Sequence, residues 1–220
     1  ESCVIEYGGA GGNNANVRIG SSTLSVRNST IRFSDGYGIF VTGTNVRPHL
    51  NGNTFDGNGG FPLHVEFASF PATLSGNVYF ANGTQAIEMA GGILTTNLSL
   101  PNEGLPYVVT GNLTVGGAGS STLTLPPGTT LRFALNTGLT IGSGGPGILI
   151  AQGTSEASIL LTSNSASPVP GQWNGVSFNS TTPASRLDHC VIEYGGAGSN
   201  DTNLVISSSL PSVRHCTIRY

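Results

Sequence analysis

Histidine precedes cysteine twice near the end of the sequence, as His189-Cys190 and as His215-Cys216. Imidazole and thiolate together are ligands that zinc prefers in proteins. Neighbouring residues of a β-strand point to opposite faces, however, so each histidine is expected outside and its cysteine inside. We therefore expect no metal site and no cofactor. Cys190 and Cys216 are expected to stack within disulfide range, either as buried free thiols or as a disulfide.

Two pairs of opposite charge share one spacing. Arg32 follows Glu6 by 26 positions, and Arg219 follows Glu193 by the same interval. Each pair has the groups of an acid and an electrophile, but an ion pair between successive outward positions explains the same residues. Because the relation occurs twice, we interpret both as surface ion pairs.

Acidic residues that could act on polysaccharides are few and scattered. A calcium-dependent lyase needs clustered carboxylates beside a base, and a glycosidase needs two opposed carboxyl groups. The sequence contains no Lys, and its best remaining carboxyl pair is Glu66 and Glu88. We therefore expect no catalytic residues and a protein that is not an enzyme.

The composition indicates an all-β chain with many turns. Gly, Ser, Thr and Asn make up nearly half of the 220 residues, hydrophobic residues 37% and charged residues 9%. Gly, Asn and Thr interrupt every amphipathic stretch, which opposes helices. The net charge of −3 is too small for a disordered chain and provides no basic surface for nucleic acid. No apolar run approaches the ~20 residues of a membrane-spanning helix, so we expect no membrane insertion in this segment.

A long internal repeat divides the chain. The segment 3–11 (CVIEYGGAG) returns unchanged as 190–198. We interpret residues 3–189 as one repeat of 187 residues and residues 190–220 as the start of the next. The parent protein is therefore expected to be a longer tandem array.

A shorter spacing of 24 relates Ile31, Phe55 and Tyr79. Units of this length, with short alternating apolar segments parted by Gly, Asn and Pro, are typical of a β-solenoid whose coils stack on one another. At ~4.8 Å per coil, one long repeat would measure roughly 37 Å.

Several segments resemble a known family. The segments 173–178 (WNGVSF) and 187–196 (LDHCVIEYGG), preceded by 131–133 (LRF), 138–141 (GLTI) and 151–154 (AQGT), resemble the coils of secreted bacterial right-handed parallel β-helix repeat proteins of the pectate-lyase-like superfamily. The resemblance implies a single-stranded right-handed parallel β-helix in which residues 1–220 form one continuous solenoid of about nine coils of ~24 residues. It also implies an extracellular or cell-surface location.

Alternation along the strands separates inward from outward side chains. The charged side must be the outer one, so the residues that alternate with Glu6 and Arg32 should form the core. The predicted core ladder consists of Cys3, Ile5, Tyr7, Ile31, Phe33, Phe55, Tyr79, Cys190, Ile192, Tyr194, Cys216 and Ile218. Asn53 and Asn77 are predicted to form an asparagine ladder, in which stacked amides satisfy polar groups at a tight corner.

These features predict a mechanical function. We expect a structural module of a giant tandem-repeat protein, such as a surface filament, a stalk or an adhesin rod. Its expected partners are neighbouring repeats of the same protein, stacked end to end, with surface glycans as an alternative partner and no nucleic acid. Two other functions stay open, which are a polysaccharide-active β-helix enzyme (lyase or glycoside hydrolase) and a glycan-binding adhesin.

Overall fold

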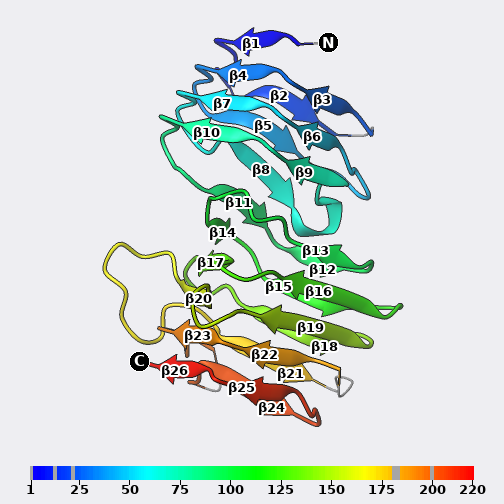
Figure 1. Ribbon diagram of the computed structural model, residues 1–220, viewed down its shortest axis with the longest axis vertical. Helices are drawn as coiled ribbons and strands as arrows, with labels where there is room; N and C mark the ends of the chain where they lie inside the picture. The colour runs from blue at the N-terminus through cyan, green and yellow to red at the C-terminus, as the bar shows by residue number, and fades with distance from the viewer. Residues whose placement is uncertain (1, 12–13, 21–22, 180–183, 199–200) are drawn as a thin grey trace. The chain divides into compact units, whose positions relative to one another are not determined.

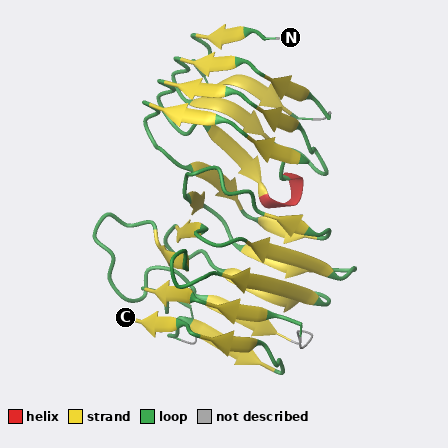
Figure 2. Cartoon of the chain, viewed as in Figure 1, coloured by secondary structure: helices red, strands yellow, loops and turns green. Residues whose placement is uncertain are grey.

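The computed structural model describes residues 2–11, 14–20, 23–179, 184–198 and 201–220. Over these ranges the chain consists of β-strands and turns, with a single short 3-10 helix, η1 (Phe67–Ser69) (Figure 2). The strand pairs are parallel, and a strand pairs with the strand three places later in the chain (Figure 1). Three strands therefore complete one coil, and the predicted all-β solenoid is confirmed.

The chain forms two compact units. Unit 1 comprises Glu1–Met89 and Glu103–Pro106, and unit 2 comprises Ala90–Asn102 and Tyr107–Tyr220. In unit 1, the strands of the three coil faces are, in order, β1 (Val4–Glu6), β4 (Thr30–Arg32), β7 (Thr54–Asp56) and β10 (Val78–Phe80); β2 (Ala15–Ile19), β5 (Tyr37–Val41), β8 (Leu63–Glu66) and β11 (Ile87–Ala90); and β3 (Ser25–Arg27), β6 (His49–Asn51) and β9 (Thr73–Ser75).

Unit 2 repeats this arrangement. Its faces contain β14 (Tyr107–Val109), β17 (Thr130–Phe133), β20 (Ile159–Ser163), β23 (Cys190–Glu193) and β26 (Thr217–Arg219); β12 (Gly92–Leu94), β15 (Leu113–Gly116), β18 (Leu139–Ser143), β21 (Val176–Asn179) and β24 (Leu204–Ser207); and β13 (Leu98–Ser99), β16 (Ser121–Leu125), β19 (Gly147–Gln152), β22 (Arg186–Asp188) and β25 (Ser212–Arg214).

The length of a coil varies more than the 24-residue spacing indicates. In unit 1, Thr30 pairs with Thr54 and Thr54 with Val78, so the spacing of 24 holds there. In unit 2, Leu139 pairs with Val176, 37 positions later. The additional residues form a loop between β20 and β21, drawn in yellow at the left of Figure 1. Strand register is thus conserved while the loops absorb the differences in length.

The core consists of the inward residues of the interior strands. Ile31 and Phe55 are fully buried in unit 1. In unit 2, Ile192 is fully buried and Cys190 is 1% exposed. The ring of Tyr79 stacks on Phe55 with 5.2 Å between centroids. Like residues therefore pack on like residues from coil to coil, as the ladder predicts.

The outermost strands are less well covered. Ile5 on β1 is half-buried and Cys3 beside it is exposed. Cys216 is half-buried and Ile218 on β26 is 46% exposed. Cys3 and Ile218 are less covered than the interior members of the ladder, because β1 and β26 are the outermost strands of their sheets.

The inward assignment of three aromatic residues is wrong. Tyr7 is 74% exposed, Phe33 is 39% exposed and Tyr194 is half-buried. All three adopt left-handed backbone, with φ between 53° and 63°. A left-handed residue breaks the alternation of a strand, so the side chain turns outward at the corner. There Tyr7 stacks on Phe33 with 5.5 Å between ring centroids.

Asparagine ladders hold the corners of unit 1. The Asn53 side chain, which is fully buried, donates from Nδ2 to Asn77 Oδ1 (3.1 Å) and to the Val26 carbonyl (2.9 Å), and its Oδ1 accepts from the Ser29 amide (3.1 Å). Each amide therefore binds the coil before it and the coil after it, and the backbone groups of the corner are satisfied without water.

A second ladder, absent from the sequence-based prediction, lies at another corner. Asn16 donates to Asn58 Oδ1 (3.3 Å), and Asn58 donates to Asn82 Oδ1 (2.8 Å) and to the Ile31 carbonyl (3.1 Å). The Ser34 amide donates to Asn58 Oδ1. The spacing of 24 between Asn58 and Asn82 was visible in the sequence and is the signal that could have revealed it.

We predict that Asn58→Ala strongly destabilises the protein. The substitution leaves buried partners in both neighbouring coils unpaired, at a cost of about 1–3 kcal/mol for each. The control is Asn51→Ala, which removes hydrogen bonds with Ser75 and Thr73 at the exposed surface and should change the free energy of unfolding by less than about 1 kcal/mol. Guanidinium denaturation measures both. Equal effects of the two substitutions would contradict the ladder's role.

Candidate functional site

The two predicted ion pairs form between adjacent coils. Arg32 Nε lies 2.6 Å from Glu6 Oε2, and Arg219 Nη2 lies 2.8 Å from Glu193 Oε2. The hydrogen bond from each arginine to its glutamate raises the pKa of both guanidinium groups. Glu193, unlike Glu6, is buried. Each carboxylate is held by its arginine, so these positions have the arrangement of a structural contact between coils.

An aromatic and acidic cluster lies on the outward side of β5, β8 and β11. The rings of Phe40 and His64 stack with 3.9 Å between centroids, and His64 Nδ1 lies 2.8 Å from Glu88 Oε2. His64 and Glu88 are both buried. Burial and a hydrogen bond with Glu88 raise the pKa of Tyr37 to about 12. We call Tyr37, Phe40, His64 and Glu88 the outer cluster.

Glu66, the other member of the candidate carboxyl pair, is engaged separately. It accepts hydrogen bonds from the Thr42 hydroxyl (2.6 Å) and the Gly43 amide (3.2 Å) of the preceding coil. Glu88 is likewise engaged by His64. A glycosidase needs one carboxyl group free to donate a proton and another facing it. Glu66 and Glu88 instead join neighbouring coils, as the charged residues of the ion pairs do.

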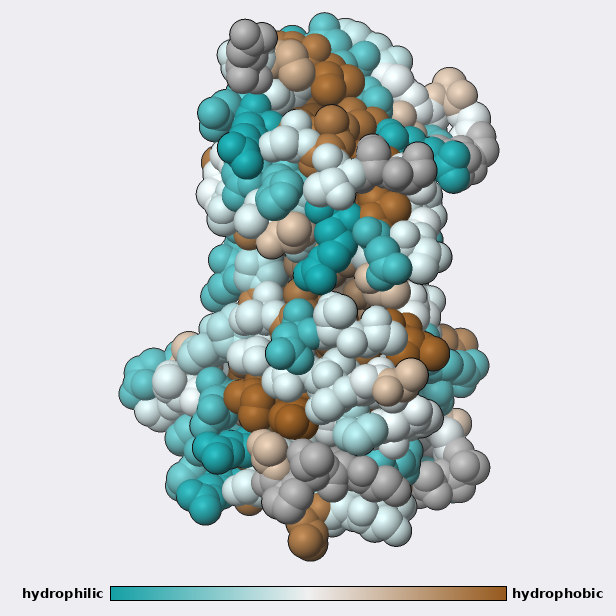
Figure 3. Space-filling view, turned by 90° about the vertical axis from the view of Figure 1, so that its right-hand side faces the viewer, coloured by the Kyte–Doolittle hydropathy of each residue, from teal (hydrophilic) through white to brown (hydrophobic). Residues whose placement is uncertain are grey.

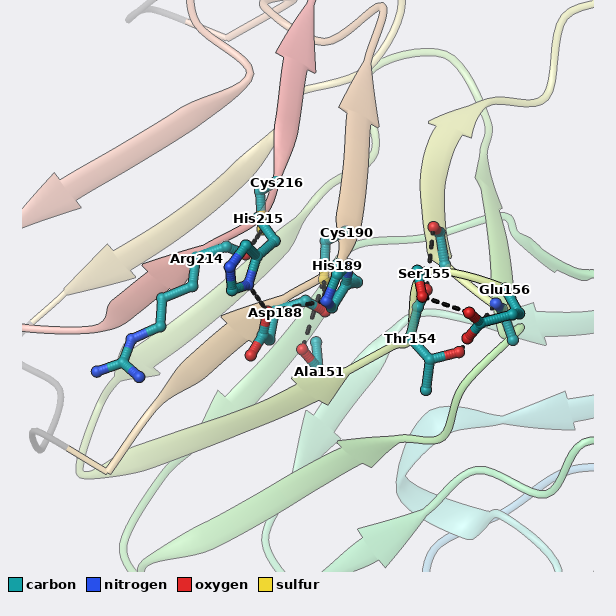
Figure 4. A network of polar contacts seen from close by, with 12 residues as sticks. Ala151, Thr154, Ser155, Glu156, Asp188, His189, Cys190, Arg214, His215 and Cys216 are labelled. Atoms are coloured by element: carbon teal, nitrogen blue, oxygen red, sulfur yellow. Dashed lines mark hydrogen bonds and ion pairs between the residues drawn. The ribbon is translucent and has the colours of Figure 1, made fainter.

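Three metal-ligating side chains meet at a corner of unit 2. Asp188, His189 and His215 each place one ligand atom within 4.8 Å of the others. Asp188 Oδ1 lies 2.8 Å from His215 Nδ1 and 3.8 Å from His189 Nε2. The hydrogen bond from His215 lowers the pKa of Asp188. Figure 4 shows the two imidazoles side by side beyond the carboxylate, and their ring centroids are 4.8 Å apart.

The sequence predicted part of this corner. Each histidine faces outward while Cys190 faces inward, as expected, but the histidines reach that side through left-handed backbone between strands and not through alternation. The prediction left out Asp188, and it did not foresee that His189 and His215 both adopt left-handed backbone with φ of 48°. Aspartate next to the first histidine was the available signal.

The cysteines near this corner are free thiols. Cys190 Sγ contacts the Ala151 carbonyl oxygen at 3.4 Å. Burial, followed by the neighbouring Cys216 thiol, raises the pKa of Cys190 to about 12. Cys3, at the corresponding position of the first copy, is exposed and lies 3.3 Å from the Ser29 hydroxyl.

No protein-family model, curated protein or solved structure matches the chain. Within the described residues, the structure has no helix of the length and apolar character that crossing a membrane requires.

We predict that Tyr37 ionises about two pH units above an ordinary tyrosine. The folded protein then binds a proton that the unfolded chain releases near pH 10. The stability that comes from keeping Tyr37 protonated in the folded state is fully present below pH 10. It is lost as the pH rises towards about 12. Tyrosinate absorbance and unfolding at alkaline pH measure it. Tyr37→Phe should remove the late transition, whereas Tyr7→Phe, at an exposed position, should not.

We predict that thiol reagents distinguish the cysteines. With its pKa near 12, Cys190 is thiolate in on the order of one molecule in ten thousand at pH 8. Cys3 should therefore be modified rapidly by a disulfide reagent, and Cys190 should become reactive only after unfolding. Mass spectrometry of labelled peptides over time measures the order. Labelling of Cys190 as fast as Cys3 in the folded protein would contradict the burial of this thiol.

Proposed function

We propose that this chain is a structural module of an extracellular tandem-repeat β-solenoid, serving as part of a surface filament, stalk or adhesin rod rather than as an enzyme. The observation that carries the proposal is the recurrence of the same contacts between coils at an interval of 187 residues. The pairing of β1 with β4 recurs as the pairing of β23 with β26. The hydrogen bonds of Asn16 at the corner recur at Asn203.

Stacking of coils produces these contacts. In the first copy, β5, β6 and β7 pack over β2, β3 and β4. The partners in this proposal are neighbouring repeats of the same protein, stacked in the same register.

The two copies also form the same contacts. The strand register of Val4 on Thr30 recurs as Val191 on Thr217. The stack of Tyr194 on Tyr220, with 4.9 Å between ring centroids, takes the place of the aromatic stack at the first copy's corner.

Asparagine contacts recur too. Asn16 accepts from the Gly8 amide at 2.8 Å and donates to the Arg32 carbonyl at 2.8 Å. Asn203 does the same with the Gly195 amide (2.7 Å) and the Arg219 carbonyl (3.1 Å). Recurrence of a corner in this detail is expected when selection preserves stacking between repeats.

The surface is compatible with a long exposed structure. Figure 3 shows one face, on which hydrophobic residues form separate patches among hydrophilic and neutral ones. Only 9% of residues are charged. Dispersed apolar residues on a polar surface limit non-specific association. An extracellular location rests on the resemblance of the coils to secreted β-helix proteins and is part of the proposal.

The alternative is a glycan-binding adhesin or a polysaccharide-active enzyme. The outer cluster favours it, because aromatic rings beside a carboxylate are groups that bind sugars. In this chain, however, Glu88 is buried against His64 and Tyr37, so the carboxylate serves contacts between coils.

The tandem proposal predicts a result for a chain in which residues 3–189 occur twice before residues 190–220. Amide hydrogen exchange in the strands equivalent to β24, β25 and β26 should slow at the internal junction and stay fast at the final one. The single copy provides the control. Two copies that scatter X-rays as independent bodies, with unchanged exchange at the junction, would contradict the proposal.

An activity assay separates the alternatives. Release of reducing sugar or of unsaturated uronate from polysaccharides, with and without calcium, should stay at the level of the buffer. Turnover that Glu88→Gln abolishes would establish the enzyme and overturn the structural role.

A further inference from the structure

Asp188, His189 and His215 form the group of potential metal ligands that the described residues bring together at a corner of unit 2. Asp188 ends β22, His189 follows it, and His215 lies between β25 and β26 on the next coil. Left-handed backbone at both histidines directs their rings to the same outer edge, while Cys190 points into the core (Figure 4). We call these three residues the Asp-His-His corner.

The distances are close to those of a metal site. Zinc bound to histidine nitrogen and aspartate oxygen at about 2.0–2.2 Å separates its tetrahedral ligands by roughly 3.3–3.5 Å. Here Asp188 Oδ1 lies 2.8 Å from one imidazole nitrogen and 3.8 Å from the other. All three ligand atoms lie within 4.8 Å of one another. A shift of about 1 Å or less in each side chain brings them to the separation that zinc requires.

The side chains have room for that shift. Side-chain exposure is 31% for Asp188, 32% for His189 and 66% for His215. The imidazoles lie nearly parallel, at 15°, and rotation of the exposed His215 ring turns its nitrogen towards a common point. The ligand set of two imidazoles and one carboxylate is of borderline softness and suits zinc.

We propose that Asp188, His189 and His215 bind a zinc ion, with water at the fourth position. On binding, zinc replaces the hydrogen bond between His215 Nδ1 and Asp188 Oδ1, and the His215 ring carries its proton on Nε2. The ion joins the β22–β23 corner to the β25–β26 corner of the next coil, so it fastens two coils together. This inference does not depend on the structural role of the chain, because the ligands are present in a single copy.

The surrounding charge sets the strength of binding. A cavity of about 320 Å³ beside the corner is lined by Asp188 together with Arg186 and Arg214. Two arginines that line the same cavity as Asp188 oppose a cation and favour an anion as the exchangeable fourth ligand. We therefore expect moderate affinity, weaker than that of a closed structural zinc site, and tighter binding when a small carboxylate or phosphate is present.

The first copy lacks this corner. Ser2 and Asn28 occupy the positions of His189 and His215, and the counterpart of Asp188 lies outside the described residues. Asn28 has a φ of 51°, nearly the same as His215. Asparagine tolerates left-handed backbone well, so His215→Asn removes a ligand while it preserves the corner. The chain thus supplies its own matched variant.

The experiment is calorimetric titration of the intact chain with zinc chloride at pH 7.5. One equivalent of zinc should bind, and zinc should raise the midpoint of thermal unfolding. His215→Asn should weaken binding about tenfold or more and abolish the thermal shift. His49→Asn, which removes a histidine elsewhere on the surface, should leave both unchanged. Cobalt(II) in place of zinc should give the visible spectrum of a tetrahedral nitrogen and oxygen site.

Cys216→Ser separates the corner from the thiols. Serine is the residue of the first copy at this position, Ser29, so this variant should fold. It should still bind zinc if the Asp-His-His corner is the site. Loss of binding in Cys216→Ser, or a cobalt spectrum with thiolate charge-transfer bands, would assign the metal to the cysteines and overturn the proposal. Absence of binding to the unaltered chain, or full binding by His215→Asn, would overturn it as well.

Discussion

Backbone hydrogen bonds between successive coils are the constraint on which the rest of this structure depends. Because they run from one coil to the next, a residue's neighbours are set by register, not by distance along the chain. Ile31 lies on Phe55 and Asn53 on Asn77 for this reason. The corners would leave backbone groups buried and unpaired, and the asparagine amides satisfy them. Loops of different length can then emerge from the corners without disturbing the strands.

Sequence periodicity predicted the parts of the fold that obey this register. It found the solenoid, the interior core residues and the Asn53–Asn77 pair, because each follows from alternation and a spacing of 24. It failed where the backbone leaves the extended region. Tyr7 and Phe33 continue the alternating pattern in the sequence, yet left-handed φ turns them outward. No residue type at those positions signals the change, because aromatic residues seldom adopt that conformation.

The candidate sites also divide into those that strand register predicts and those that depend on backbone outside the extended region. The ion pair of Glu193 and Arg219 could be predicted from strand geometry alone. The outward histidines of the Asp-His-His corner could be predicted, but the meeting of its three ligands could not, since they converge through two left-handed residues and a strand end. Outward polar groups elsewhere in the described chain, such as Glu66 and Glu88, are largely used to join coils. A corner is where an outward group can serve another purpose, because the stacking of the strands does not require it.

Left-handed corner positions have a consequence for how such a protein can diversify. Asn28 and His215 share a backbone conformation, and the two differ in what their side chains can ligate. One amino-acid replacement at a corner can therefore install or delete chemistry while the hydrophobic interior stays untouched.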